Sequence, residues 1–222
     1  MIPLYDTLRP RRFPLVNWVL IIANALIFWY EIRLSPGALR GLVETWGVIP
    51  VEFHADLYAE WQTLFSSMFL HGGWFHLLSN MWVLFIFGDN VEDRMGGFSY
   101  LIFYLLCGLA AALLQAYVLP TSRLPMIGAS GAIAGVLGAF MIFFPRARIA
   151  SLVPILFIFT LVEIPAVLFL IFWFVSQLFS GLMSLEGASG GVAWWAHIGG
   201  FVFGMIAANI FAPRPRRVVR TW

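Results

Sequence analysis

Long apolar segments, separated by short stretches rich in charges, prolines and glycines, make up most of this sequence. Hydrophobic residues occupy 61% of the positions and charged residues 11%, whereas soluble domains average about 25% charged residues. A soluble fold could not bury so much apolar surface, so we expect most of the chain to lie in lipid. We predict an all-α membrane protein with six transmembrane helices, at about 15–29, 74–87, 98–118, 130–144, 166–183 and 193–211.

One further apolar stretch, 149–165, is ambiguous because it contains Pro154, Glu163 and Pro165. A carboxylate at mid-membrane is costly, so we expect an interfacial connector here, with an early start of the fifth span as the alternative. The first residues do not resemble a removable signal peptide. We expect one membrane domain over residues 1–222, with an N-terminal segment (1–14), a six-helix core (15–211) and a basic tail (212–222).

The arginines indicate how the bundle is oriented, because six spans place both termini on one side. All 13 basic residues are arginines. The side opposite the termini holds Arg33, Arg40 and Arg123, and the remaining ten fall on the side of the termini. The positive-inside rule assigns the arginine-rich side to the cytoplasm. We therefore expect a multi-pass protein of the cell membrane with cytoplasmic termini and an extracytoplasmic loop at about 33–72.

Polar side chains gather near the outer ends of the second, fourth and sixth segments, which all run from the outside inwards. The second segment carries His76 and Asn80, the fourth carries Ser130 and the sixth carries His197. Polar residues inside apolar spans are costly and usually functional. At about 1.5 Å per residue, Asn80 lies roughly 10 Å and His197 roughly 6 Å below the start of its span. These side chains can therefore meet at one depth.

Ser130 lies in the sequence Gly128-Ala129-Ser130-Gly131, where the fourth helix begins. Free backbone N–H groups and the helix dipole at such a position favour a developing negative charge, which suits a nucleophile whose product is an oxyanion. The alternative for an isolated motif of this kind is a plain N-cap. The motif is not the Gly-x-Ser-x-Gly elbow of soluble hydrolases, because position 132 is alanine.

His197 is followed by Gly200 and Gly204, which form a small-residue face, and the fourth segment has a matching face at Gly131. Such faces let two helix backbones approach closely. Close approach would bring His197 to Ser130, where an imidazole can take the hydroxyl proton. Taken alone, His197 would be interpreted as a buried neutral histidine bonded to a backbone carbonyl; together with Ser130 and the facing glycines it favours a base.

His76 and Asn80 are four residues apart and share one helix face, so an imidazole and an amide together can supply donors to an oxyanion. A metal site formed by His71, His76 and His197 is the alternative, but no carboxylate or thiol lies at ligand spacing. We therefore expect no metal and no cofactor. No acidic residue lies near His197 in the sequence, which favours a Ser-His dyad over a triad with an acid.

These motifs occur in an order that resembles the rhomboid family of intramembrane serine proteases, in its compact prokaryotic form: His71-x4-His76-x3-Asn80, Gly128-Ala129-Ser130-Gly131 and Ala196-His197-x-x-Gly200-x-x-x-Gly204. The segment 91–96, Val-Glu-Asp-Arg-Met-Gly, resembles the Glu-x-Arg-x-Gly element of that family. The resemblance covers residues 12–211 and implies a rhomboid-like bundle of six transmembrane helices.

The resemblance also implies an activity and a set of roles. A member of this family is a serine endopeptidase that cleaves transmembrane segments of membrane-protein substrates from a site open to the extracytoplasmic side. It implies that Ser130 is the nucleophile and His197 the general base and acid. His76, Asn80 and the backbone N–H of Ser130 would form the oxyanion hole. Structural support would come from His71, Gly128, Gly131, Gly200, Gly204, Glu92 and Arg94, and the fifth helix with the loop 184–192 would be a lateral gate and cap.

Two positions depart from the family pattern. Some members have a tyrosine four residues after the nucleophile that supports the histidine, and here that residue is Ala134. We expect Trp194 or Trp195 to hold the imidazole instead. The Trp-Arg pair of the first loop is only partly present, because Trp61 is followed by Gln62.

The expected partners are transmembrane protein substrates and the lipid bilayer, with no nucleic acid; the oligomeric state stays open. One alternative is a catalytically inactive rhomboid-like factor that binds membrane proteins, although such relatives generally lack the serine or the histidine. A transporter is the other alternative, but it would need paired carboxylates at mid-membrane, which the six segments do not offer.

Overall fold

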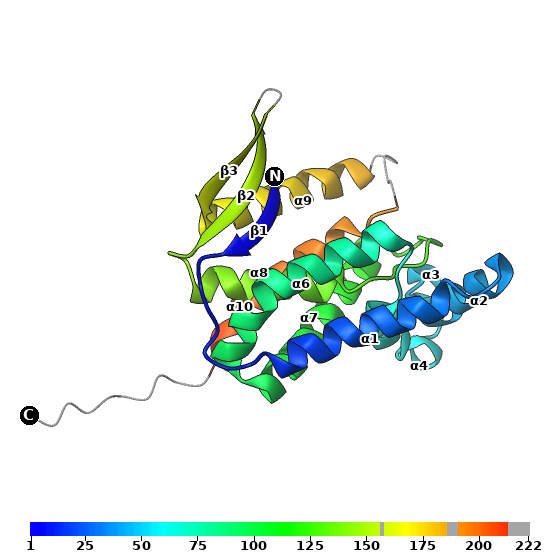
Figure 1. Cartoon of the computed structure of the whole chain (residues 1–222). Helices are drawn as coiled ribbons and strands as arrows, with labels where there is room; N and C mark the ends of the chain where they lie inside the picture. The colour runs from blue at the N-terminus through cyan, green and yellow to red at the C-terminus, as the bar shows by residue number, and fades with distance from the viewer. Residues whose placement is uncertain (156–157, 186–190, 213–222) are drawn as a thin grey trace, which may run out of the picture.

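The computed structural model describes residues 1–155, 158–185 and 191–212. It is mostly helical, and its longer helices begin and end within a few residues of the predicted segments, apart from a second helix that continues to Met95 (Figure 1). They are α1 (Leu15–Glu31), α6 (Trp74–Met95), α7 (Gly97–Val118), α8 (Ser130–Phe143), α9 (Ala166–Leu185) and α10 (Trp194–Phe211). Most of the predicted basic tail, and residues 186–190 of the predicted cap, lie outside the described residues.

Three helices of the described chain, α7, α9 and α10, are long and apolar enough to cross a membrane by length and composition. Two more, α1 and α8, are apolar but shorter, at 17 and 14 residues. The last turns of α6 carry acidic residues and Arg94. The chain is therefore a membrane protein, and the count of six spans stays a prediction.

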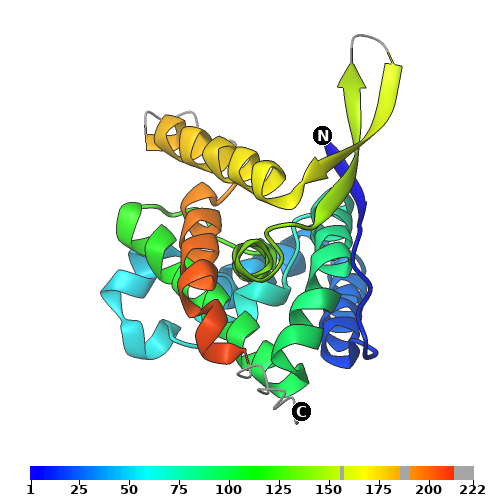
Figure 2. The same ribbon diagram turned by 90° about the vertical axis from the view of Figure 1, so that its left-hand side faces the viewer.

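Helix α8 lies at the centre of the bundle, where Figure 2 shows it end-on. It packs against α6, α7, α9 and α10, and every residue from Gly131 to Phe140 is buried. A helix that is apolar on all sides needs such an environment. Protein rather than lipid surrounds α8, so its length need not match the thickness of the bilayer.

Helices α8 and α10 pack backbone against backbone because glycines line their contact. A Cβ atom added to Gly200 would overlap the carbonyl group of Gly131, and one added to Gly204 would overlap the backbone of Gly135. Cys107 of α7 lies against Gly135 and is buried. The small-residue contact expected between the fourth and sixth helices is present.

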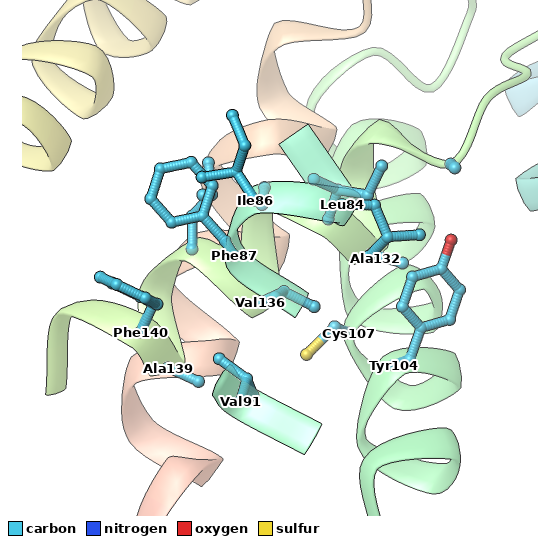
Figure 3. Packing of buried hydrophobic residues seen from close by; sticks show 14 of the residues in the cluster. Leu84, Ile86, Phe87, Val91, Tyr104, Cys107, Ala132, Val136, Ala139 and Phe140 are labelled. Atoms are coloured by element: carbon cyan, nitrogen blue, oxygen red, sulfur yellow. The ribbon is translucent and has the colours of Figure 1, made fainter. Parts of the chain in front are cut away.

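Larger side chains fill the space between α6, α7 and α8 (Figure 3). Phe87 of α6 meets Phe140 of α8 edge-on, with ring centroids 5.0 Å apart, and stacks on Phe169 of α9 at 6.5 Å. Each of the three rings is at most 8% exposed. Phe87 thus joins its own helix α6 to both the central helix α8 and α9.

Glu92 of α6 caps the N-terminus of α1, which has no side-chain cap of its own. Its carboxylate accepts hydrogen bonds from the backbone N–H groups of Val16 at 3.1 Å and Asn17 at 2.7 Å. A negative charge is favourable at this end of a helix dipole. Nearby, the guanidinium of Arg94 lies over the ring of Phe143, 5.5 Å from its centroid. The two side chains connect α6 to α1 and to α8.

We predict that Glu92→Ala lowers the free energy of unfolding by about 2–4 kcal/mol, because one buried and one part-buried N–H group at the start of α1 lose their acceptor. Thermal unfolding in detergent measures the change. Glu44→Ala is the matched control, because Glu44 is an exposed carboxylate on α2 (Pro36–Trp46). Equal unfolding temperatures for the two variants would contradict the capping role.

The all-α prediction is wrong in one region, which forms a three-stranded antiparallel sheet in the order β1 (Ile2–Asp6), β2 (Arg148–Ile155) and β3 (Ile158–Pro165). The stretch 149–165 is a connector, as expected, and not the start of the fifth helix. Its β-branched and aromatic residues favour extended backbone, and Pro154 disfavours a helix. Glu163 is exposed on β3.

Two side chains of α6 hold the first strand of this sheet. The indole Nε1 of Trp82 donates to the carbonyl of Pro3 at 2.7 Å, and the amide of Asn90 donates to the carboxylate of Asp6 at 3.0 Å. The third strand leads directly into α9. The sheet therefore links α6 with the beginning of α9 (Figures 1 and 2).

The predicted loop at 33–72 consists of short helices at the end of the bundle where α6, α8 and α10 begin (Figure 1). It packs on the bundle through an apolar cluster in which Phe53 and Leu64 accompany Ala112 and Ala116 of α7. The loop elements are α2, α3 (Pro50–Ala55), α4 (Leu57–Glu60), α5 (Thr63–Ser66) and the short 3-10 helix η1 (Ser67–Phe69). This packing leaves the starts of the three helices accessible.

Candidate active site

Ser130 and His197 are hydrogen-bonded to each other. Ser130 Oγ lies 2.8 Å from His197 Nε2, although 67 residues separate them in sequence. Ser130 is the first residue of α8, and His197 lies in the first turn of α10. The N-cap of α8 is Ala129 and no side chain caps this end, so the serine hydroxyl is used for the histidine and not for the helix. The glycine contact between α8 and α10 brings the two side chains together.

The other nitrogen of His197, Nδ1, lies 2.8 Å from the side-chain oxygen of Gln177 on α9. Trp173, one turn earlier on α9, lies beside the imidazole at 6.0 Å between ring centroids and 32° between planes. The expectation that Trp194 or Trp195 holds the histidine is only partly met. Trp194 meets the imidazole edge-on at 6.0 Å, while Trp195 lies close to Gly181.

Gln177 is thus a site residue that sequence analysis missed. The polar residues singled out above lie on the second, fourth and sixth segments, yet Ser176-Gln177 is a polar pair in the middle of the apolar fifth segment. The cost of a polar residue inside a span would have marked it. No glycine pattern or catalytic motif accompanies this pair, so the sequence did not connect it with Ser130 and His197.

A cavity of about 680 Å³ opens at this pair of residues. Its lining comes from α6, α8, α9 and α10 and from the loop segments before them, and it includes His76, Asn80, Ser130, Gln177 and His197. The structure therefore brings the predicted polar residues of the second, fourth and sixth segments into one cavity. Among the described residues, no aspartate or glutamate lines it.

Asn80 presents an unused hydrogen-bond donor in this cavity. Its side chain is 7% exposed, and the buried amide nitrogen Nδ2 has no hydrogen-bond partner in the part of the chain that the structure describes. Buried polar groups are nearly always paired, and each unpaired one costs about 1–3 kcal/mol. The Asn80 amide can therefore donate a hydrogen bond to a group bound in the cavity.

His76 is oriented so that a second donor faces the same space. Its Nδ1 accepts a hydrogen bond from the backbone N–H of Gly72 at 3.4 Å, which leaves the proton of the neutral ring on Nε2. Gly128 lies against this side of the ring. A Cβ atom added to Gly128 would stand 2.6 Å from Nε2 and 3.7 Å from Nδ2 of Asn80. Its φ of +120° also favours glycine.

His71 and Glu31 hold the loop that leads into α6. Both carboxylate oxygens of Glu31 accept from the backbone N–H of His71 at 3.2 Å. The His71 ring lies edge-on to that of His76, with centroids 5.0 Å apart. Burial, followed by the nearby charge of His76, lowers the pKa of His71 to about 4, so this ring is neutral at pH 7. Glu31 was not identified from the sequence.

A second, smaller recess of about 190 Å³ lies deeper between α6, α8 and α9. Asn80, Ser130, Trp173 and His197 border it, and so does Ala134. Ala134 replaces the tyrosine that some family members have at this position. Its small side chain leaves open space next to the serine.

Comparison with known proteins shows the family of this chain. Residues 58–214 match the Rhomboid domain. Rhomboid protease AarA of Providencia stuartii is 28% identical over 90% of this chain and 74% of its own length. RHOMBOID-like protein 1 of Arabidopsis thaliana is 30% identical over 82% of this chain and 42% of its own length. Rhomboid-like protein 11, chloroplastic, of the same plant is 38% identical over 35% of this chain.

This chain spans 28% and 42% of the lengths of these two plant relatives, so the comparison concerns their shared membrane region. The matched domain includes α6, α8, α9 and α10, which line the cavity. Because the domain match covers most of the sequence, the chain belongs to the rhomboid family.

Proposed function

We propose that this protein is an intramembrane serine endopeptidase that hydrolyses peptide bonds in or near transmembrane segments of other membrane proteins. The observation that carries the proposal is the hydrogen bond between Ser130 Oγ and His197 Nε2 at a cavity with an unpaired amide donor. A nucleophile, a base in contact with it and free donors beside it are the parts that acyl transfer needs. A rhomboid relative is itself named a protease.

The reaction begins when Ser130 Oγ attacks the carbonyl carbon of the scissile bond while its proton passes to His197 Nε2. The carbonyl oxygen becomes an oxyanion, to which Asn80 Nδ2, His76 Nε2 and the backbone N–H of Ser130 donate. The last group is available because the first N–H groups of a helix have no acceptor within it. His197 then protonates the leaving amine, and the C–N bond breaks to leave an acyl-enzyme.

Water completes the cycle. His197 takes a proton from a water molecule, the resulting hydroxide attacks the ester, and the proton returns to Ser130 Oγ. The cavity provides the route by which water reaches this site. A substrate helix hides its carbonyl groups in hydrogen bonds, so its backbone must become extended before it reaches Ser130. Substrates with glycine or another helix-destabilising residue near the cut should be preferred.

The proposal includes a topology for the bundle. Six spans in the cell membrane, with both termini in the cytoplasm, would place the loop 33–72 and the cavity at the extracytoplasmic side. The arginine distribution supports this orientation, and so does the position of the short helices α2–α5 at the end where the cavity opens. We propose that residues 1–222 act as one membrane domain.

Three alternatives have less support. A catalytically inactive binding factor would not require a serine in contact with a histidine. A transporter would use carboxylates, and none lines the described cavity. A metal site needs free ring nitrogens, whereas both nitrogens of His197 have hydrogen-bond partners.

Labelling with a fluorophosphonate probe tests the proposed function directly. The activated Ser130 Oγ displaces fluoride from phosphorus, so we expect a covalent adduct at Ser130. His197→Ala should slow labelling by about 100-fold or more, because the base that removes the hydroxyl proton is lost. Mass spectrometry locates the adduct. Ser122→Ala, which changes a serine of the loop before α8, is the control and should label at the wild-type rate. Absence of an adduct in the wild type would reject a serine hydrolase.

A further inference from the structure

The side chain of Gln177 occupies a fixed position between α9 and the proposed dyad. It is 6% exposed. Its amide nitrogen donates to the carbonyl oxygen of Trp173 at 3.1 Å and to the hydroxyl of Ser176 at 2.9 Å. The Ser176 hydroxyl in turn donates to the same carbonyl oxygen at 2.6 Å. Both hydrogens of the amide are used within α9, so the amide oxygen must point towards His197.

This orientation determines which nitrogen of His197 carries the proton. An amide oxygen only accepts hydrogen bonds, so the 2.8 Å contact requires a hydrogen on Nδ1. In the neutral ring Nε2 is then bare, and its lone pair faces the hydroxyl of Ser130. A general base needs this tautomer, since the opposite one would place a hydrogen between Nε2 and the nucleophile.

We propose that Gln177 is the positioning residue of the active site, which sets the tautomer and the ring orientation of His197. This inference rests on the proposed function. In serine proteases with a triad, a carboxylate has this task. A carboxylate would be costly within a membrane, and a neutral amide supplies the acceptor without a charge. The Gln177 amide thus orients His197 in a chain that has alanine, not tyrosine, at position 134.

Ser130, His197 and Gln177 come from three helices that are held in the bundle in different ways. Ser130 and His197 lie on α8 and α10, which glycines lock backbone to backbone. Gln177 lies on α9, which crosses the outside of the bundle (Figure 2) and exposes large apolar side chains along its length. Displacement of α9 would withdraw the acceptor from Nδ1. The geometry of the base therefore depends on where α9 lies.

Helix α9 approaches α10 next to Gln177. Four residues later, a Cβ atom added to Gly181 would meet side-chain atoms of Ile198 and Trp195 at 3.4 Å. This is ordinary contact distance, so a single methyl group fits there, whereas a larger side chain would push α9 away from α10. Gly181 offers a way to move the helix without altering Gln177.

The first test compares Gln177→Met, Gln177→Glu and the control Ser184→Ala, all on α9. Methionine has nearly the shape of glutamine, but it has no amide oxygen and its thioether sulfur is only a weak acceptor. Its kcat for a transmembrane substrate should fall about 10–100-fold, with KM nearly unchanged, because the base spends time in the wrong tautomer. A protonated glutamate can still accept from Nδ1 and donate to Trp173, so Gln177→Glu should recover most of the loss. Among the described residues, Ser184 bonds to Gly181 of its own turn, and Ser184→Ala should behave as wild type.

Nitrogen NMR of histidine-labelled protein supplies a readout that a structural role alone would not change. The wild type should show His197 protonated at Nδ1, with the resonance assigned from the His197→Ala variant. Gln177→Met should show a mixture of tautomers, and so should Gly181→Leu, while Gly181→Ala should not. An unchanged tautomer and kcat in Gln177→Met would overturn the positioning role. An unchanged tautomer in Gly181→Leu would overturn its dependence on α9.

The two proposals fail in different ways. If the wild type neither cleaves a substrate nor reacts with a fluorophosphonate, the proposed function fails, and the NMR result then describes only a buried histidine. If the wild type cleaves and Gln177→Met cleaves equally well, the protease assignment stands and the role of Gln177 is rejected.

Discussion

Replacement of Ser130 by alanine is expected to reduce cleavage of a model transmembrane substrate by about 10⁴-fold or more. The variant keeps the cavity and the donors of Asn80 and His76 but has no oxygen to attack the carbonyl carbon. Folding should be unaffected, because the hydroxyl does not cap α8 and its described hydrogen bond is to His197. Gel-based cleavage in native membranes measures the activity, and thermal unfolding in detergent measures the stability.

His197→Ala should cause a loss of similar size, and the double variant should be no worse than either single one. Residues that act as a unit give non-additive effects of this kind. Normal cleavage by Ser130→Ala would remove the assignment of the nucleophile. Independent losses that multiply in the double variant would show that the two residues do not act in one step, despite the 2.8 Å contact between them.

The helices were predictable because the sequence marks their ends clearly. Pro14 precedes α1 and Pro145 follows α8, whereas α6 continues beyond its predicted end at 87 as far as Gly96, whose φ is +85°. Each of these residues interrupts a helix for a local reason, through a missing N–H group or a preference for unusual backbone angles. Local signals of this kind need no knowledge of the tertiary structure.

The convergence of Ser130 and His197 was predictable for a different reason. Glycines four residues apart form a face that another helix can approach closely, and Gly200 and Gly204 lie directly after His197. The structure shows these glycines against the backbone of α8. A contact between two helices could thus be inferred from one-dimensional spacing, because glycine has few other uses inside an apolar helix.

The sheet and the role of Gln177 were not predictable, because both depend on partners distant in sequence. The N-terminal strand pairs with β2 about 145 residues later, and no local pattern specifies that pairing. Gln177 contacts His197 only because α9 lies beside α10, and the two residues are twenty positions apart in the sequence. Glu31 likewise depends on His71, forty residues away.

The two kinds of contact suggest a division of tasks within the bundle. Glycine packing fixes Ser130 and His197 relative to each other. Under the proposed function, two buried side chains of the flanking helices, Asn80 on α6 and Gln177 on α9, supply the donor for the oxyanion and the acceptor for the imidazole. In this proposal, α8 and α10 hold Ser130 and His197 in place, and α6 and α9 supply the side chains that determine the reactivity of this pair.

Asn80→Ala is expected to lower kcat by about 10²–10³-fold with little change in KM, the usual cost of losing one oxyanion donor. The amide nitrogen Nδ2 has no hydrogen-bond partner among the described residues, so it is available to a group that enters the cavity. Its hydrogen bond forms as negative charge develops on the carbonyl oxygen. Fluorophosphonate labelling should slow as well, because the attack on phosphorus also produces an oxyanion.

The same variant should be as stable as the wild type or more stable, since it removes a buried donor that is unpaired and costs about 1–3 kcal/mol. Loss of activity with a gain in stability is characteristic of a residue kept for function. Asn24→Ala is the matched control. Asn24 is fully buried on α1, its Nδ2 donates to the carbonyl of Leu20, and it does not line the cavity, so its removal should leave kcat unchanged. If Asn80→Ala instead lowers the unfolding temperature and keeps its kcat, Asn80 is a structural residue and the oxyanion must be stabilised by His76 and the backbone of Ser130 alone.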